Sequence, residues 1–279
     1  MKEISENQIR NAVKELFLKA NLSLPEDVSA ALKKAEEQET WALAKESLCL
    51  LEKNLCIACE KQLPICQDTG AACVFAEIGT DVHIAGDFSK AVNDGVRDAY
   101  KEGFFRMSIA ADPIRRGNTE DNTPAFISAE ITAGDKLKLT VMPKGFGSEN
   151  MSRLAMLKPS DGEQGVIDFV LETVKLAGPN PCPPTVLGIG IGGSFDKAPY
   201  LAKKALMRPL DLPNPDPYYA DLEKRLLEAI NSLGIGPQGF GGRTSCLGVQ
   251  IETMPTHVAG LPVAVNVSCH ATRRASTVL

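Results

Sequence analysis

The chain has 279 residues, of which 44% are hydrophobic and 23% are charged, and its formal net charge is −5. This composition is typical of a globular protein with a sizeable buried core. The acidic balance and an aromatic content of only 5% argue against nucleic-acid binding, which needs basic patches or stacking surfaces. No apolar run approaches the ~20 residues that cross a bilayer, and the charged start is unlike a signal peptide, so we expect a cytoplasmic protein without membrane contact.

Residues 1–60 predict helices. The first helix is indicated by apolar residues at helical spacing, namely Ile9, Val13, Leu16 and Phe17. Ser23 and Glu26 match a capping box at the start of a second helix, and a third helical segment begins near Glu39. The following segments predict a buried strand over 71–77, a helix capped by Asp87 that ends near Gly103, and a polar loop over 112–124.

The middle of the chain alternates as two strands over 126–132 and 136–142, and the Ala-Gly-Asp between them suits a hairpin turn. Further elements follow in order: a helix opened by a capping box at Ser160 and Glu163 and ended at Gly178, a short strand before a Gly-rich turn over 188–193, helices to Met207 and to Leu233, and strands over 244–251 and 262–267. No internal sequence repeat is visible.

These elements predict a mixed α/β (α+β) fold, rich in helices around a small central β-sheet. We expect one domain over residues 1–279. The stretch 209–217, with a proline at every second or fourth position, is the best candidate for an internal linker.

Eight cysteines in a reducing compartment favour metal, cluster or core roles over disulfides. Cys66, Cys182 and Cys269 each lie in a loop or at a strand end. The other five lie in or beside helical or apolar segments, where free cysteine usually acts as a small buried hydrophobe: Cys49, Cys56, Cys59, Cys73 and Cys246. The Cys-x-x-Cys pair at 56–59 lacks a second pair for zinc and a preceding strand for a redox motif, which favours a structural role.

Three separated loop cysteines suit one chemistry in particular. A four-iron cluster that is bound by three thiolates leaves one iron open, and that iron can bind a hydroxyl and a carboxylate as a Lewis acid. Dehydration of a 2-hydroxy acid needs such help, because hydroxide is a poor leaving group. Spacing alone does not establish a cluster site, since the three cysteines are far apart in sequence.

Two other interpretations have less support. Gly188-x-Gly-x-x-Gly193 matches the dinucleotide fingerprint of an NAD-linked oxidoreductase, but no second strand with an acidic residue follows. We interpret these glycines as a tight turn with close backbone packing. A zinc-stabilised binding module without catalysis is a remote alternative.

Basic side chains in polar loops supply candidate ligands for carboxylates. Arg106, Arg115 and Arg116 lie near or within the polar loop over 112–124, and guanidinium groups match carboxylate geometry. His257 and His270 flank Cys269, and His257 lies in a loop just before a strand, where it can serve a site.

Several segments in order resemble class I (iron–sulfur) fumarate hydratases and L(+)-tartrate dehydratases, over roughly residues 40–279. The similar segments are Pro-Ile-Cys66-Gln-Asp-Thr-Gly70, the loop over 112–124, Lys144-Gly-Phe-Gly-Ser-Glu-Asn150, Gly178-Pro-Asn-Pro-Cys182-Pro-Pro184, Gly190–Ala198, His257, and Cys269-His-Ala-Thr-Arg-Arg274. Phe146 departs from the family's all-glycine loop.

The resemblance implies a site and a cofactor. Cys66, Cys182 and Cys269 would hold a 4Fe-4S cluster. Gln67, Asp68, Arg106, Gly145 and His257 match positions that contact a dicarboxylate substrate, with Asp68 and His257 in catalytic roles. Arg106 would clamp a carboxylate, and Gln67 and His257 would hydrogen-bond to substrate oxygens.

The resemblance also implies a partner. Single-chain relatives continue into a second domain that supplies the catalytic base, whereas this sequence stops after the third cysteine motif. The expected enzyme is therefore a hetero-oligomer of alpha and beta subunits, with this chain as alpha, that hydrates fumarate to (S)-malate in the tricarboxylic acid cycle. Dehydration of L(+)-tartrate to oxaloacetate is the alternative. An open iron would make the cluster sensitive to oxygen.

Overall fold

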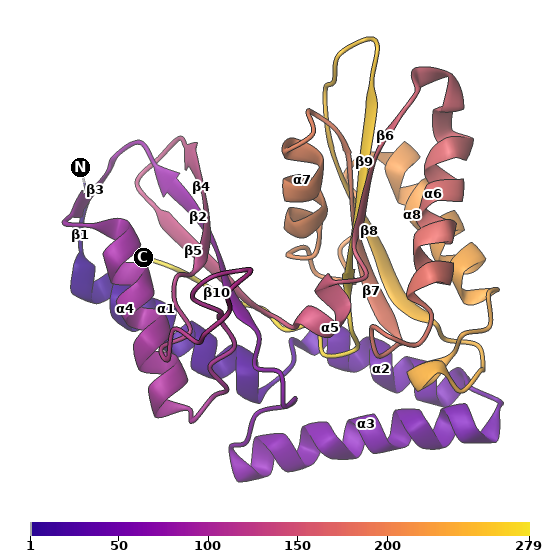
Figure 1. Cartoon of the computed structure of the whole chain (residues 1–279), viewed down its shortest axis with the longest axis horizontal. Coiled ribbons are helices and arrows are strands. Elements are labelled where there is room, and N and C mark those ends of the chain that lie inside the picture. The colour runs from indigo at the N-terminus through magenta and orange to yellow at the C-terminus, as the bar shows by residue number, and fades with distance from the viewer. Residues whose placement is uncertain (1) are drawn as a thin grey trace. The chain divides into compact units, whose positions relative to one another are not determined.

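The computed structural model describes residues 2–279, which fold as two compact units (Figure 1). Unit 1 comprises the chain up to Pro25, Leu55–Phe146 and Arg273–Leu279. Unit 2 comprises Glu26–Asn54 and Gly147–Thr272. The predicted mixed α/β class is confirmed, and the strands form one four-stranded sheet in each unit besides a small parallel pair. No helix within residues 2–279 is long and apolar enough to cross a membrane.

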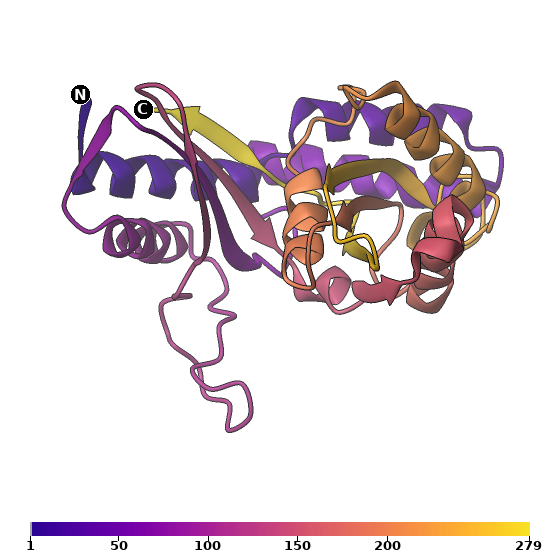
Figure 2. The ribbon, with the colours of Figure 1, turned by 90° about the horizontal axis from the view of Figure 1, so that it is seen from above.

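Unit 1 is built on a sheet with the strand order β10-β5-β2-β4. Its elements are β1 (Lys2–Ser5), α1 (Glu6–Leu22), β2 (Ala71–Gly79), β3 (Val82–Ala85), α4 (Phe88–Glu102), β4 (Phe126–Thr132), β5 (Leu137–Lys144) and β10 (Ala275–Val278). The helices α1 and α4 lie side by side (Figures 1 and 2), and they share a core with alternate residues of β2 and β5. Phe17 of α1 and Tyr100 of α4 are both fully buried there.

The predicted hairpin between the two middle strands is wrong. The strands β4 and β5 are not neighbours, because β2 lies between them and pairs with both, parallel to β4 and antiparallel to β5. The connecting segment instead crosses the end of β2, where Gly79 donates to the carbonyl of Lys136 and Asp81 donates to that of Gly134. An apolar strand such as β2 is most stable in the centre of a sheet, where its backbone groups are paired on both sides.

Unit 2 has the strand order β6-β9-β7-β8. Its elements are α2 (Glu26–Gln38), β6 (Arg153–Leu157), α6 (Gly162–Ala177), β7 (Thr185–Gly192), α7 (Lys197–Ala205), α8 (Pro217–Asn231), β8 (Cys246–Met254) and β9 (Leu261–Ser268), with short 3-10 turns at Pro159–Asp161 and Pro237–Gly239. The helices α3 (Ala42–Lys61) and α5 (Phe146–Glu149) cross the divisions between the units in sequence. The proline-rich stretch 209–217 lies within unit 2.

Helices pack on both faces of the unit 2 sheet. The helices α6 and α8 cover one face, where Leu187 and Ile189 of β7 are fully buried, and α7 packs on the other. A Cβ atom on Gly188 would lie 2.0 Å from the carbonyl oxygen of Ala202 in α7, and one on Gly190 would lie 2.1 Å from that of Ala198. The expected close backbone packing is confirmed. Gly188 and Gly190 lie inside β7 and form no turn, whereas Gly192 and Gly193, with φ of 93° and 68°, lie where the chain leaves the strand.

Two helix starts also differ from the sequence expectation. Ser23 ends α1, because its hydroxyl and its backbone N–H both donate to the carbonyl oxygen of Lys19. Ser160 lies in a 3-10 turn ahead of α6. A capping box forms at Ser5 and Gln8, where each side chain satisfies the other residue's backbone N–H. Capping sequences are short, so the flanking structure decides which of them is used.

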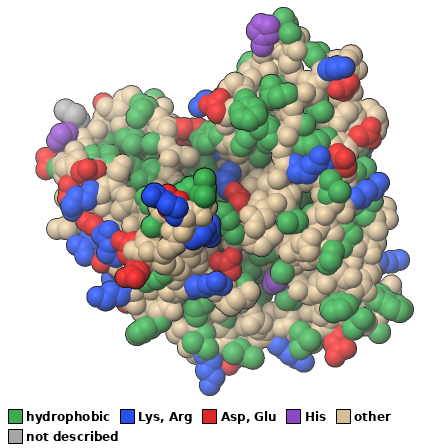
Figure 3. Space-filling model, in the orientation of Figure 1, with side chains coloured by type: hydrophobic (Ala, Val, Ile, Leu, Met, Phe, Trp, Pro, Cys, Tyr) green, Lys and Arg blue, Asp and Glu red, His purple; other side chains and the backbone are tan. Residues whose placement is uncertain are grey.

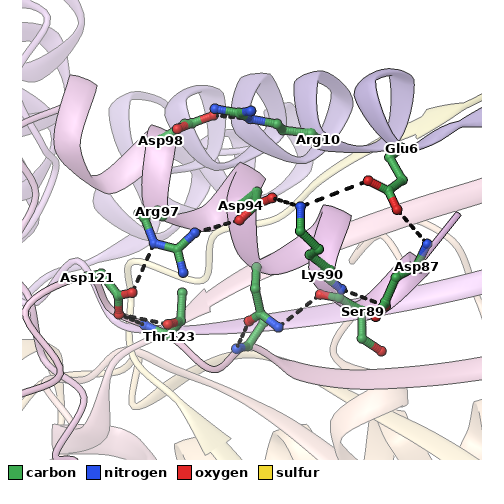
Figure 4. Close-up of polar contacts among 12 residues, drawn as sticks. Glu6, Arg10, Asp87, Ser89, Lys90, Asp94, Arg97, Asp98, Asp121 and Thr123 are labelled. Carbon is green, nitrogen blue, oxygen red and sulfur yellow. Dashed lines mark hydrogen bonds and ion pairs between the residues drawn. The ribbon is translucent and has the colours of Figure 1, made fainter.

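Acidic and basic side chains alternate over the exposed side of α4 (Figure 3). Arg97 lies between two carboxylates, 2.6 Å from Asp94 on its own helix and 3.0 Å from Asp121 in the loop after the helix (Figure 4). Asp121 also accepts the backbone N–H of Thr123. These contacts attach the base of the loop over 103–125 to α4, while the rest of that loop projects away from unit 1 (Figure 2).

Candidate active site

The loop that carries Cys66 connects α3 to β2 in unit 1, and buried polar side chains hold its C-terminal end. The hydroxyl of Tyr100 lies 2.7 Å from the carbonyl oxygens of both Thr69 and Gly70. The side-chain amide of the fully buried Asn122 donates to the same Gly70 oxygen at 3.2 Å. Burial raises the pKa of Tyr100, so its hydroxyl keeps the proton that it donates.

Asp68 is the most constrained residue of this loop. Its carboxylate accepts the backbone N–H of Gly70 at 3.0 Å and that of Phe146 at 2.9 Å. The buried guanidinium of Arg273 donates to the Asp68 carbonyl at 2.7 Å. A Cβ atom on Gly145 would lie 3.3 Å from the Asp68 carboxylate, so the loop after β5 lies directly against the Cys66 loop.

Arg106 is joined to the same group through its backbone, because the hydroxyl of Thr69 donates to its carbonyl oxygen at 3.2 Å. Its exposed guanidinium has no hydrogen bond or ion pair within the described chain. Arg115 is bound to Asp112 at 2.8 Å, and Arg116 donates to the carbonyl of Pro113. Of the three arginines singled out from the sequence, Arg106 is therefore the one available to an anion.

The half-buried thiol of Cys66 donates to the side-chain carbonyl of the exposed Gln67 at 3.2 Å. Unit 1 thus gathers five of the residues selected from the sequence, which are Cys66, Gln67, Asp68, Arg106 and Gly145. They supply a thiol, an amide, a fixed carboxylate, a guanidinium and an uncrowded backbone, which together can bind an anionic, oxygen-rich ligand.

Unit 2 brings the other two candidate ligands together. Cys182 is exposed and has a φ of 53°, and Cys269, partly exposed, follows the end of β9. The backbone N–H of His270 donates to the Cys182 carbonyl at 3.3 Å, and its ring Nδ1 lies 3.0 Å from the same oxygen. The two cysteine loops are therefore joined through the residue next to Cys269.

Sequence reasoning missed two residues that support these loops. Gln238 donates through its backbone and its side chain to the Pro183 carbonyl, at 2.7 and 2.8 Å. The buried carboxylate of Glu39 accepts the N–H of Arg243 at 2.7 Å and so holds the glycine-rich segment that carries Gln238. The run of glycines over 234–242 was the available signal, because it marks a loop that needs outside support.

His257 lies elsewhere in unit 2. It is exposed in the loop between β8 and β9, whereas Cys269 follows the opposite end of β9. The structure therefore does not bring His257 to Cys182 and Cys269 of the same chain.

The remaining cysteines differ in exposure. Cys73 and Cys246 are buried as expected, and burial raises the pKa of the Cys246 thiol to about 11. Cys56 and Cys59 are exposed, so the core role predicted for them is wrong. Both lie on the side of α3 that faces away from the core. Within residues 2–279, no three His, Cys, Asp or Glu side chains lie close enough to one another to hold a metal ion.

Comparison with known proteins identifies the family. A family model described as fumarate hydratase (Fumerase) matches residues 10–278. The putative L(+)-tartrate dehydratase subunit alpha of Methanocaldococcus jannaschii is 44% identical over 275 residues, which is 96% of each chain. The L(+)-tartrate dehydratase subunit alpha of Escherichia coli K12 is 32% identical over 276 residues, which is 98% of this chain and 91% of the relative. The chain belongs to the fumarate hydratase (Fumerase) family of hydro-lyases.

Proposed function

We propose that this chain is the alpha subunit of a two-subunit iron–sulfur hydro-lyase that interconverts fumarate and (S)-malate. The observation that carries the proposal is the family match over nearly the whole chain. It is supported by unit 1, which gathers Gln67, Asp68, Arg106 and Gly145 beside Cys66. We further propose a cytoplasmic role in the tricarboxylic acid cycle.

In this proposal Cys66, Cys182 and Cys269 hold a 4Fe-4S cluster. Their accessibility fits that role, because each thiol is exposed or partly exposed, whereas Cys73 and Cys246 are buried. The hydrogen bonds of His270 to Cys182 also bring two of the three loops together. When bound, the cluster would supply an open iron that acts as a Lewis acid toward a hydroxyl group.

The protein groups would bind and orient the substrate. The free guanidinium of Arg106 is suited to a terminal carboxylate, and Gln67 and the backbone of Gly145 can hydrogen-bond to further oxygens. Asp68 is held by two backbone N–H groups, so its remaining lone pairs have a fixed direction. A fixed carboxylate can orient a substrate hydroxyl or a proton-transferring group without reorganisation during the reaction.

We propose that a separate beta subunit completes the site and supplies the base. The support is that the relatives which match over nearly their whole length are named as alpha subunits. The beta subunit would contribute the group that removes the proton next to the far carboxylate of the substrate.

A second candidate is dehydration of L(+)-tartrate, because the relatives carry that name while the family model carries the fumarate name. Both reactions remove water from a four-carbon 2-hydroxy dicarboxylate. The same Arg106, Gln67 and Gly145 groups would serve either substrate.

The test is anaerobic reconstitution of the chain with its beta partner, followed by iron and sulfide analysis and assays with fumarate, (S)-malate and L(+)-tartrate. We expect about four irons per alpha chain and activity that requires the partner and is lost in air. Cys66→Ser should lose the cluster, while Cys59→Ser, an exposed cysteine outside the proposed site, should keep it. Failure of the wild-type chain to take up iron would reject the cluster, and full activity without the partner would reject the beta subunit.

A further inference from the structure

The guanidinium of Arg273 is a buried positive charge without a counter-ion. Only 2% of this side chain is exposed. Its two Nη groups donate to the side-chain oxygen of Asn21 at 3.1 Å and to the Asp68 carbonyl at 2.7 Å. Both acceptors are uncharged groups, and within residues 2–279 no carboxylate forms an ion pair with Arg273 and no acceptor meets its Nε.

Fold stability alone does not account for such a residue. Arginine does not lose its proton in a protein, so burial cannot neutralise the charge. A buried charge costs free energy unless it is paired, and apolar side chains of similar volume often stabilise a core better. The reason for an arginine at position 273 therefore lies in the two groups that it binds.

Those two groups hold the loop that carries Cys66. Asn21 is fully buried in the last turn of α1, and its backbone carbonyl accepts the N–H of Ile65 at 2.9 Å. The side-chain oxygen of the same Asn21 accepts from Arg273, which in turn donates to the Asp68 carbonyl. The loop is thus held on both sides of Cys66, at Ile65 by Asn21 and at Asp68 by Arg273.

The residues just before Arg273 bind the other two cysteine loops. The backbone N–H of His270 donates to the Cys182 carbonyl at 3.3 Å, and the hydroxyl of Thr272 donates to the Cys269 carbonyl at 2.8 Å. One short stretch of chain therefore contributes a hydrogen bond to the backbone of each of the three loops. Arg273 is the member of this stretch that binds the loop in unit 1.

We propose that Arg273 is a positioning residue, which fixes the backbone over 66–68 so that its side chains meet the cluster and the substrate. The inference rests on the proposed function, because that function supplies both ligands. The planar fork of arginine spans two separate acceptors, whereas the compact ammonium of lysine on its flexible stem does not reproduce that geometry. Because the guanidinium is buried, it acts through the backbone and not by contact with a ligand.

Thiol reactivity tests the proposal without an enzyme assay. Wild-type and Arg273→Lys chains are alkylated anaerobically with iodoacetamide before cluster loading, and the rate at each cysteine is followed by mass spectrometry. Because lysine keeps the positive charge, a changed rate reports on the loop itself. We expect the half-buried Cys66 to react about fivefold faster in the variant, and the exposed Cys56 and Cys59 to react at unchanged rates.

Two further variants make the result specific. Arg208→Lys is the matched control, because the Arg208 side chain is only 10% exposed and also donates to a backbone carbonyl, that of Ile251 in unit 2. It should leave the rate at Cys66 unchanged. Asn21→Ala keeps Arg273 but removes one of its acceptors, so it should also speed alkylation at Cys66, and it serves as the test if Arg273→Lys does not fold. Wild-type rates at Cys66, or an equal increase at every cysteine, would overturn the inference.

The reconstituted alpha–beta complex supplies a kinetic readout. With kcat/KM counted per cluster, we expect Arg273→Lys to be about tenfold below the wild type with (S)-malate or L(+)-tartrate, with KM raised, because misdirected ligands weaken substrate binding. Arg208→Lys should match the wild type. An unchanged kcat/KM in Arg273→Lys would overturn the inference and leave the proposed function intact. A wild-type complex without iron or without activity would instead reject the proposed function.

Discussion

The two units share one pattern of strand directions and differ in how the sheet is covered. They also differ in one edge strand, which comes last in the chain in unit 1 (β10) and first in unit 2 (β6). In each, the two central strands are antiparallel, one edge strand is parallel to its neighbour, and the other is antiparallel. In each unit one helix comes before the first central strand, and a second helix comes before the parallel edge strand. These two helices share the core of their unit. They are α1 and α4 in unit 1, and α6 and α8 in unit 2. The shared pattern of strand directions is visible only in the structure.

The candidate site residues occupy matching positions in the two units. Cys66 precedes β2 and Cys182 precedes β7, and these are corresponding strands. Gly145 follows β5 and Cys269 follows β9, which also correspond. In each unit the site loops therefore lie at the same end of the strands. The loop with His257 lies at the opposite end of the unit 2 strands.

The helix α7, which covers the second face of the unit 2 sheet, explains the main difference in sequence between the central strands β7 and β2. In β7 the face toward α7 carries Gly188 and Gly190, whose missing side chains let the helix backbone approach. In β2 the face away from α1 and α4 carries Cys73, Phe75 and Glu77. A helix that packs at backbone distance requires glycine, and a strand without such a helix keeps its side chains.

The largest expected effect tests this difference. Gly188→Ala places a Cβ atom 2.0 Å from the Ala202 carbonyl, so either α7 or β7 must move. We expect the free energy of unfolding of the chain to fall by about 3 kcal/mol. Urea unfolding followed by circular dichroism measures this. Gly147→Ala is the control, since a Cβ atom there meets no atom within 4 Å, and an equal loss in both variants would reject the packing explanation.

The next effect concerns the support of the unit 2 loops. Burial alone would raise the pKa of Glu39, but the backbone N–H groups of Trp41, Arg243 and Thr40 outweigh it and hold that pKa below its usual value. Glu39→Gln should lower the free energy of unfolding by about 2 kcal/mol at neutral pH, because an amide N–H₂ would then face backbone donors.

The pH dependence gives Glu39→Gln a second test. A carboxylate with a lowered pKa stabilises the fold above its ordinary pKa, and this stabilisation is lost as the pH falls through the folded-state pKa. The difference between wild type and variant should therefore shrink on acidification. Fluorescence of the only tryptophan, Trp41, follows unfolding locally, because its ring N–H donates to Phe240 in the same region. A difference that is independent of pH would contradict the role of the charge.

A smaller effect is expected in unit 1, where side chains and not a glycine-rich segment hold the cysteine loop. Tyr100→Phe removes the donor to the Thr69 and Gly70 carbonyls and should lower the free energy of unfolding by about 1 kcal/mol. Hydrogen exchange of the amides over 66–70 should quicken selectively. Tyr219→Phe in unit 2 is a control, and exchange that quickens equally throughout unit 1 would argue against a local role.

The smallest effect belongs to the surface of α4. Arg97→Ala breaks contacts to Asp94 and Asp121 that are largely exposed, so we expect a loss of no more than about 0.5 kcal/mol, which high salt should remove. Urea unfolding at low and high ionic strength measures it. A larger loss that persists in high salt would mean that Arg97 stabilises the base of the loop over 103–125 by packing.

The sequence alone determined the features that depend on local pattern. Helical spacing predicted α1. The capping residue Asp87 predicted the start of α4, and its side chain accepts the N–H of Lys90 as expected. Ordered motifs identified the family and the three loop cysteines, because such motifs retain their residue types whatever the pairing of strands. The assignment of Arg106 to a substrate carboxylate came from the resemblance and stays a prediction.

Only the tertiary structure decided which strands are neighbours and which site residues lie together. The insertion of β2 between β4 and β5, the addition of β10 from the chain end, and the support from Glu39 and Gln238 all depend on contacts between distant segments. His257 and Cys269 are close in sequence, yet an extended strand between them carries them to opposite ends of a sheet. Sequence proximity fails as a guide there, because a β-strand converts a short stretch of chain into a large distance.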